Sequence, residues 1–96
     1  MKTYLNIQPL SNSKIGEYIR TRREAKGWSQ DKLSKETGIT QQYISEIELG
    51  KRNFAHDFIL HIALALDTVP SEIWLQFERE ALPDARKKWK ELKGQE

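Results

Sequence analysis

The side chains most often used for metal binding and acid–base catalysis are scarce in this 96-residue chain. It has no cysteine, and its two histidines, His56 and His61, are five residues apart, a spacing that does not place them on one helical face. No glycine-rich phosphate loop, nucleophile elbow or pair of carboxylates in an apparent pocket accompanies them. The sequence therefore predicts neither an enzyme nor a metal site, and it implies no cofactor.

A second group of polar side chains is suited to hydrogen bonding. It lies on one face of a helix predicted over residues 41–49, whose isoleucines would face inward. A glutamine amide at the N-terminal end of such a helix can bond the N7 and N6 edge of adenine, and a carboxylate can accept from cytosine N4. The pattern therefore predicts a helix that enters the major groove of double-stranded DNA. The residues expected to contact bases are Gln41, Gln42, Ser45 and Glu46.

Other residues around this helix are expected to contact the DNA backbone. Such contacts set the register of a protein on DNA without reading its sequence. Gln30 begins the preceding helix, and the segment after residue 50 is basic. Tyr43 is equally suited to reaching a phosphate and to packing on the preceding helix. The full set expected at the backbone is Gln30, Thr40, Tyr43, Lys51, Arg52, Asn53 and Arg20.

Gly and Pro divide the sequence into short helical patterns without a convincing strand pair, which predicts an all-α fold. Ser13 is expected to cap a first helix over about residues 14–26. A short second helix should end at Gly38, where a left-handed backbone makes a tight turn, and Thr40 should cap the third. Ser34 must be small because the third helix crosses close to it. These features predict two helices joined by a turn, which is a helix-turn-helix unit.

The second half of the chain predicts further helices. The pattern from Asp57 to Asp67 is apolar almost all round, as in a central helix covered by its neighbours. Pro70 should open a fifth helix, and Pro83 should separate it from a basic segment with Trp89. That segment would either pack on the fifth helix or offer its apolar side chains to a partner. We therefore expect an N-terminal arm at residues 1–12, a DNA-binding domain at 13–82, and a basic helix or tail at 83–96.

Arg23 and Glu48 each continue an apolar helical stripe by one turn, from Ile19 and Ile44 respectively. Two charges would then face the core, and an unpaired buried charge is costly. We expect the two side chains to pair between the first and third helices. Their role would be structural: to fix the orientation of the reading helix.

Three stretches of sequence together resemble the phage-repressor-like helix-turn-helix proteins, the Cro/CI or XRE family. They are Arg-Arg-Glu-Ala-Lys-Gly-Trp-Ser-Gln at 22–30, Thr-Gly-Ile-Thr-Gln-Gln-Tyr-Ile-Ser-Glu-Ile-Glu at 37–48, and Gly-Lys-Arg-Asn at 50–53. The resemblance runs from about Ile15 to Trp74. It implies a five-helix, usually dimeric DNA-binding domain, here with an additional C-terminal helix, and a salt bridge at the positions of Arg23 and Glu48. The sequence departs from the common pattern at Ser34 and Phe54.

Charge and hydropathy indicate the class of partner and the cellular compartment to expect. Residues 14–35 hold seven Lys/Arg and three acids, a local excess of +4, whereas residues 56–83 hold one base and five acids, giving −4. Segregation of this size suits a polyanionic partner but is also typical of solvated helix faces. The longest apolar-rich run, residues 58–66, is too short to cross a bilayer. A chain without cysteine also fits a reducing compartment, so we expect a cytoplasmic protein without a membrane partner.

Two biological roles follow from these features. The first is a transcriptional repressor that binds an inverted-repeat operator as a homodimer. The second is an antitoxin, because residues 63–66 and 73–75 resemble the corresponding region of host-inhibition-of-growth antitoxins, which bind a toxin and repress their own operon. A restriction-modification controller is a further alternative. An interaction module that does not read DNA is disfavoured by the exposed Gln41–Gln42 pair.

Overall fold

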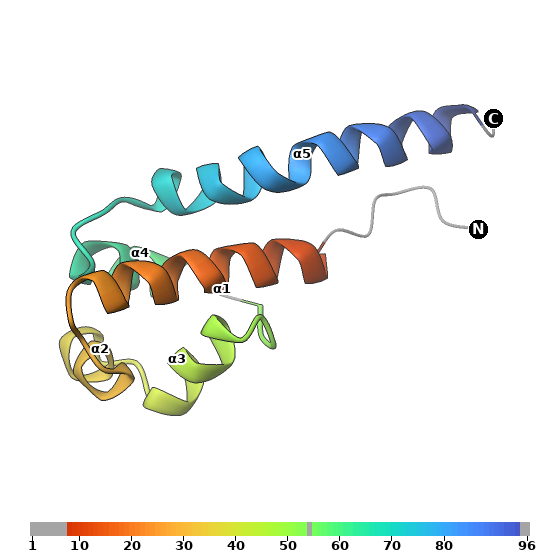
Figure 1. Ribbon diagram of the computed structural model, residues 1–96. Helices are drawn as coiled ribbons and strands as arrows, with labels where there is room; N and C mark the ends of the chain where they lie inside the picture. The colour runs from red at the N-terminus through yellow and green to blue at the C-terminus, as the bar shows by residue number, and fades with distance from the viewer. Residues whose placement is uncertain (1–7, 54, 95–96) are drawn as a thin grey trace.

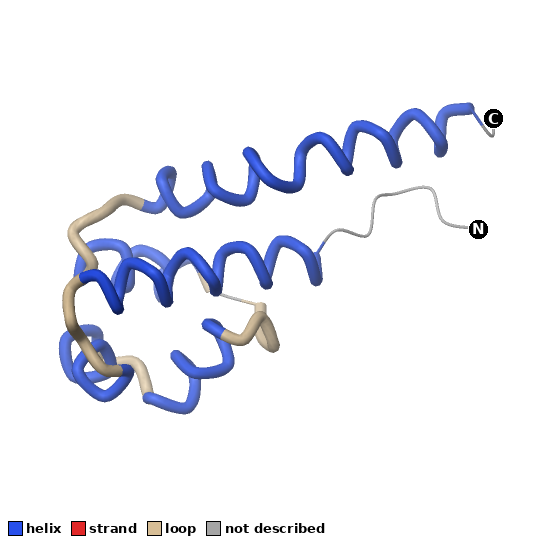
Figure 2. The backbone as a smooth tube through the Cα atoms, viewed as in Figure 1, coloured by secondary structure: helices blue, strands red, loops and turns tan. Residues whose placement is uncertain are grey.

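A computed structural model describes residues 8–53 and 55–94, and within these ranges the chain is all-helical. The predicted all-α class is confirmed. Figure 1 shows α1 in the middle of the molecule, with α5 along one side of it and α2 and α3 on the other, and short loops join the helices (Figure 2). The helices are α1 Gln8–Ala25, α2 Gln30–Thr37, α3 Gln41–Glu48, α4 His56–Ala65 and α5 Pro70–Gly94.

Local capping explains how α2 and α3 begin and how they are joined. The Ser29 side chain accepts a hydrogen bond from the Lys32 backbone N–H at the start of α2, and Thr40 does the same for Tyr43 at the start of α3. Between the helices, Gly38 has φ 76°, and its N–H bonds the Ser34 carbonyl. A residue with a Cβ is strained at this φ, so glycine suits the turn. The predicted helix-turn-helix unit is therefore present.

The core gathers one buried stripe from each helix. Helices this short gain most of their stability from packing such a stripe, because the isolated helices are marginal in water. The two isoleucines predicted to face inward from the third helix, Ile44 and Ile47, belong to this core. The largest fully buried side chains are Ile15, Ile19, Leu33, Ile44, Ile47, Ile62, Leu66 and Ile73.

α1 begins at Gln8, five residues earlier than its expected cap at Ser13. The prediction relied on the local preference of serine for helix N-termini, and tertiary contacts override it. Asn12 is buried, and its side-chain N–H donates to Asn53 Oδ1 at 2.8 Å. Gly50 passes so close that a Cβ there would lie 3.0 Å from the Ser13 Cα. Residues 8–12 of the predicted arm are thus helical, and residues 1–7 lie outside the described ranges.

α5 continues through Pro83, so the separate helix predicted after this residue is instead the second half of α5. Proline removes one intrahelical hydrogen bond and leaves the Arg79 carbonyl without its donor. Both residues are exposed, so water can satisfy that carbonyl. On the opposite face of α5, Ala81 and Ala85 are buried before and after Pro83 and keep the helix continuous. Of the two alternatives left open for this segment, packing back on the fifth helix does not occur, because both are parts of one helix.

α4 is covered less completely than its apolar sequence suggested. Ile59, Ile62 and Ala63 are buried, but Leu60 and Leu64 are exposed. The expectation of a helix packed on all sides is therefore wrong, because no described element covers this face. In the described part of the chain no single helix is long and apolar enough to cross a membrane; α4 and α5 reach that threshold only when taken together, and they are bent by 104°.

Candidate nucleic-acid interface

The inward face of α3 is held tightly against α1. Ile44 and Ile47 are fully buried, and Gly16 of α1 meets the C-terminal end of α3. A Cβ at residue 16 would lie 2.1 Å from the Ile47 carbonyl oxygen and 2.9 Å from that of Glu48, closer than atoms can approach. Only glycine allows the two helix backbones to come this near without a shift. α3 therefore has a fixed position relative to the core.

Arg23 and Glu48 pair between α1 and α3, in the arrangement expected from the sequence. Arg23 Nε donates to Glu48 Oε2 at 2.7 Å, and Nη2 donates to Oε1 at 2.9 Å. The two residues are only 8% and 6% exposed. Arg23 Nη1 also donates to the Trp28 carbonyl at 2.7 Å, and Gln30 donates to Glu48 Oε1 at 3.1 Å. The hydrogen bonds with Glu48 raise the pKa of Arg23 above its ordinary value, against the opposing effect of burial.

The outward face of α3 carries the residues expected to contact bases. Gln41 and Gln42 are exposed at its N-terminal end, and Ser45 and Glu46 are partly exposed one turn further. All four lie away from the buried isoleucines. Side chains at the N-terminal end of a recognition helix are the ones that reach base edges in the major groove. The structure thus brings these four residues together on one exposed face.

Glu46 is engaged with residues of the same surface. Its Oε2 accepts from Arg52 Nε at 2.9 Å and lies 2.9 Å from Arg52 Nη2. The hydrogen bond with Arg52 is the largest cause of a Glu46 pKa below the ordinary value; burial opposes it, and a hydrogen bond with Gln42 adds to it. Arg52 also lies over the Tyr43 ring, with its guanidinium carbon 4.7 Å from the ring centroid. This network was not predicted, because residues 43, 46 and 52 share no motif that signals their contact.

Tyr43 packs on a different helix from the one considered in the sequence analysis. Its ring packs edge-on against Phe58 of α4 at a centroid distance of 4.8 Å, not on α2. Its hydroxyl donates to the Asn53 carbonyl at 3.2 Å. Tyr43 therefore ties the loop after α3 to the core, and it remains partly exposed beside Arg52.

The remaining residues expected at the DNA backbone come from α1, the start of α2 and the segments on either side of α3. Lys51 and Asn53 are exposed in the loop after α3, and Arg20 is exposed on α1. Gln30 is partly buried and engaged with Glu48, so its side chain serves the core as well as the rim of the surface. Thr40 uses its hydroxyl oxygen as the α3 cap. The side chains of this set are therefore not equally free to meet a phosphate.

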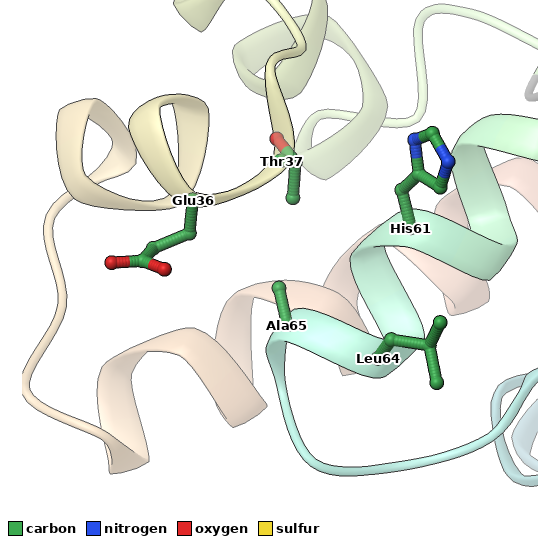
Figure 3. Close-up of a pocket in the computed structure, with 5 residues that line it drawn as sticks. All are labelled: Glu36, Thr37, His61, Leu64 and Ala65. Atoms are coloured by element: carbon green, nitrogen blue, oxygen red, sulfur yellow. The ribbon is translucent and has the colours of Figure 1, made fainter.

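Other surface features lie away from α3. A hollow of about 410 Å³ between α2 and α4 is lined by Glu36, Thr37, His61, Leu64 and Ala65. Figure 3 shows the first two on α2 and the other three on α4. Within the described ranges no three His, Cys, Asp or Glu side chains gather in a way that could hold a metal ion.

Residues 19–74, more than half of the chain, match the family described as Helix-turn-helix. The chain belongs to the XRE-type helix-turn-helix family. The match extends from the middle of α1 to the first turn of α5 and contains every base-contact position predicted on α3. As a member of this family, the protein is a DNA-binding transcriptional regulator.

Solved structures agree with this family. The restriction-modification controller protein C.AhdI from Aeromonas hydrophila is 38% identical, has a TM-score of 0.65, and is matched over 97% of its chain and 67% of this one. The clp gene regulator ClgR from Corynebacterium glutamicum is 21% identical, with a TM-score of 0.71 over 92% of its chain and 88% of this one, and it supports the fold alone. No curated protein sequence matches the chain.

Proposed function

We propose that this regulator binds an inverted-repeat operator as a homodimer and represses transcription from it. The observation that carries the proposal is the asymmetry of α3, which is locked to α1 on one face and carries Gln41 and Gln42 exposed at its N-terminal end on the other. A rigidly held helix can present its amides to base edges in a single geometry. Two copies would place their α3 helices about one DNA turn, roughly 34 Å, apart.

Within this proposal the exposed side chains divide into two functions. Gln41 and Gln42 read adenine through bidentate amide contacts, and Ser45 touches a base or a thymine methyl group. The surrounding polar residues hold phosphates and supply affinity that does not depend on sequence. The DNA-binding domain is proposed to span residues 13–82. The phosphate set is Gln30, Thr40, Tyr43, Lys51, Arg52, Asn53 and Arg20.

An exposed apolar surface supports the homodimer. Leu60 and Leu64 of α4, Val69 before α5, and Trp74 of α5 are all exposed, and Trp74 borders a hollow of about 440 Å³ next to Ile59. An exposed aromatic side chain beside an apolar hollow commonly marks an interface. α5 lies on the side of α1 opposite α3 (Figure 1), so a second copy bound there leaves α3 open to DNA.

A restriction-modification controller is the second candidate, and the similarity to C.AhdI over 97% of that chain favours it. Such a role would use the same α3 surface on a different regulated operon. The antitoxin alternative would place a toxin on the apolar surface around Trp74 instead of, or beside, a second copy. In each case the protein acts where the DNA is, which in a bacterial cell is the cytoplasm.

The test is selection of binding sites from random duplex DNA by the purified protein at near-physiological salt, repeated with Gln41→Ala, Gln42→Ala and Lys51→Ala. We expect an enriched inverted repeat. Each glutamine variant should relax base preference with a loss of about 1 to 3 kcal/mol, whereas Lys51→Ala should weaken binding to all sequences similarly. No enriched motif, or equal losses on every sequence for all three variants, would contradict the proposal. Sedimentation of the wild type and of Trp74→Glu then tests the dimer.

A further inference from the structure

The carboxylate of Glu46 is poorly placed to read a base on its own. Its Oε2 accepts a hydrogen bond from Arg52 Nε at 2.9 Å and lies 2.9 Å from Arg52 Nη2. Both contacts fall on the same oxygen, so Oε2 is committed to the guanidinium. A base contact at Oε2 would require displacing Arg52 beside the negative charge of DNA.

The same contacts fix Arg52. A guanidinium has five N–H donors in a rigid plane, and Glu46 engages two of them, on Nε and Nη2. The face of the group is covered by Tyr43, whose ring is itself held by Phe58 and by the Asn53 carbonyl. Three N–H donors on Nη1 and Nη2 remain outside this pairing, and they form an edge that can bind two acceptors at once.

The position of that edge follows from the helix. Gln42 and Glu46 are one turn apart and share the exposed face of α3, so the ion pair draws Arg52 from the loop onto the face that carries the base-contact residues. The Arg52 side chain is 45% exposed there. An arginine held next to base-reading residues has the geometry for guanine, whose O6 and N7 accept a bidentate pair.

We propose that Glu46 is a positioning residue, and that the Arg52 it holds against Tyr43 is a base reader that recognises guanine. The inference rests on the proposed binding of a specific operator and adds to it a preference that Gln41 and Gln42 do not supply. Pairing with Arg52 also offsets the negative charge of Glu46, which would otherwise repel the phosphates. It replaces the assignments of Glu46 as a base contact and of Arg52 as a phosphate contact.

The test uses the selected operator in three forms: unmodified, with each guanine in turn replaced by 7-deazaguanine, and with each G·C pair in turn replaced by A·T. Removing N7 deletes one of the two acceptors for arginine and leaves the paired cytosine N4 unchanged. Wild type is compared with Arg52→Lys, Glu46→Gln and a double variant, and Lys51→Ala serves as the matched loop control. Circular dichroism melts establish that each variant is folded.

We expect one guanine at which A·T replacement weakens wild-type binding by about 5- to 150-fold and 7-deazaguanine weakens it several-fold. Arg52→Lys, which keeps the charge but loses the planar fork, should abolish this discrimination. Glu46→Gln should reduce it at the same guanine, and the double variant should lose no more than Arg52→Lys alone. Lys51→Ala should bind all templates more weakly while keeping the discrimination.

Three results would overturn the inference. Insensitivity of the wild type to every 7-deazaguanine, with a G·C preference that only Glu46→Gln removes, would make Glu46 a direct reader of cytosine. A uniform loss for Arg52→Lys on all templates would make Arg52 a phosphate contact. Additive losses in the double variant would show that the two residues act separately. Failure of the wild type to select any operator would instead contradict the proposed function.

Discussion

Replacement of Glu48 by alanine tests whether the buried pair with Arg23 holds α3 in place. The change removes two charge-assisted hydrogen bonds of 2.7 and 2.9 Å. Arg23, which is 8% exposed in the wild type, keeps only the Trp28 carbonyl as a hydrogen-bond partner. Gln30 loses its acceptor as well. Breaking a buried pair from one side costs about 3 to 5 kcal/mol, because the remaining charge is uncompensated.

That cost is large for a chain of this size. A stability of roughly 5 to 14 kcal/mol is ordinary for 96 residues, and 1 kcal/mol shifts the melting temperature of such a domain by about 4 to 8 °C. Glu48→Ala should therefore lower the melting temperature by about 12 to 40 °C, measured by circular dichroism or calorimetry. The exposed pair of Lys14 and Glu80 is the matched control, and Glu80→Ala should change the melting temperature much less.

A double variant separates the uncompensated charge from the loss of the pair itself. With Arg23→Met and Glu48→Met together, no charge remains in the core, and such replacements are often neutral or stabilising. We expect the double variant to have a higher melting temperature than Arg23→Met alone or Glu48→Met alone. A single-variant cost below about 1 kcal/mol, or a double-variant cost equal to the sum of the two, would refute the reasoning about a desolvated charge.

Three further predictions concern other elements. Gly16→Ala should lower the melting temperature strongly, because its Cβ would meet the α3 carbonyls, whereas Gly94→Ala, with no atom within 4 Å, should not; equal effects would show that α3 does not depend on this approach. Pro83→Ala should raise the free energy of unfolding by up to about 3 kcal/mol, and with it the melting temperature, because it restores a helix hydrogen bond inside α5. An unchanged melting temperature would mean that the second half of α5 does not unfold with the core. The pKa of Glu46 should lie below the ordinary glutamate value in the wild type and return towards it in Arg52→Gln, as measured by carboxyl NMR. Because the folded-state pKa is lowered, the stabilisation from this pair is present above the ordinary value and disappears as the pH falls through the lowered one; an unchanged pKa in the variant would contradict the pairing.

The sequence predicted the elements whose signals are local. Gly38 marks the end of α2 by its left-handed backbone and Thr40 marks the start of α3 by its side-chain cap, and both boundaries agree with the structure. The buried stripe of α3 follows directly from the spacing of Ile44 and Ile47. Periodicity and capping therefore sufficed for the helix-turn-helix unit, because its determinants lie next to one another in the chain.

Features set by distant contacts were missed. The early start of α1 depends on Asn12 meeting Asn53, 41 residues away, and the continuation of α5 through Pro83 depends on the burial of Ala81 and Ala85. Local rules give the opposite answer at both places. The partners of Glu46 were likewise out of reach, because a loop conformation brings Arg52 to it, and no periodicity encodes that conformation.

The division of α3 into a held face and an exposed face has a consequence for how the protein can diverge. Gly16, Ile44 and Ile47 determine where the helix sits, whereas Gln41 and Gln42 take no part in holding it. The exposed positions can then be rewritten while the scaffold stays intact. A paralogue could acquire a new operator by substituting a few exposed residues of an eight-residue helix. Grafting those residues would likewise change the DNA specificity of an engineered protein.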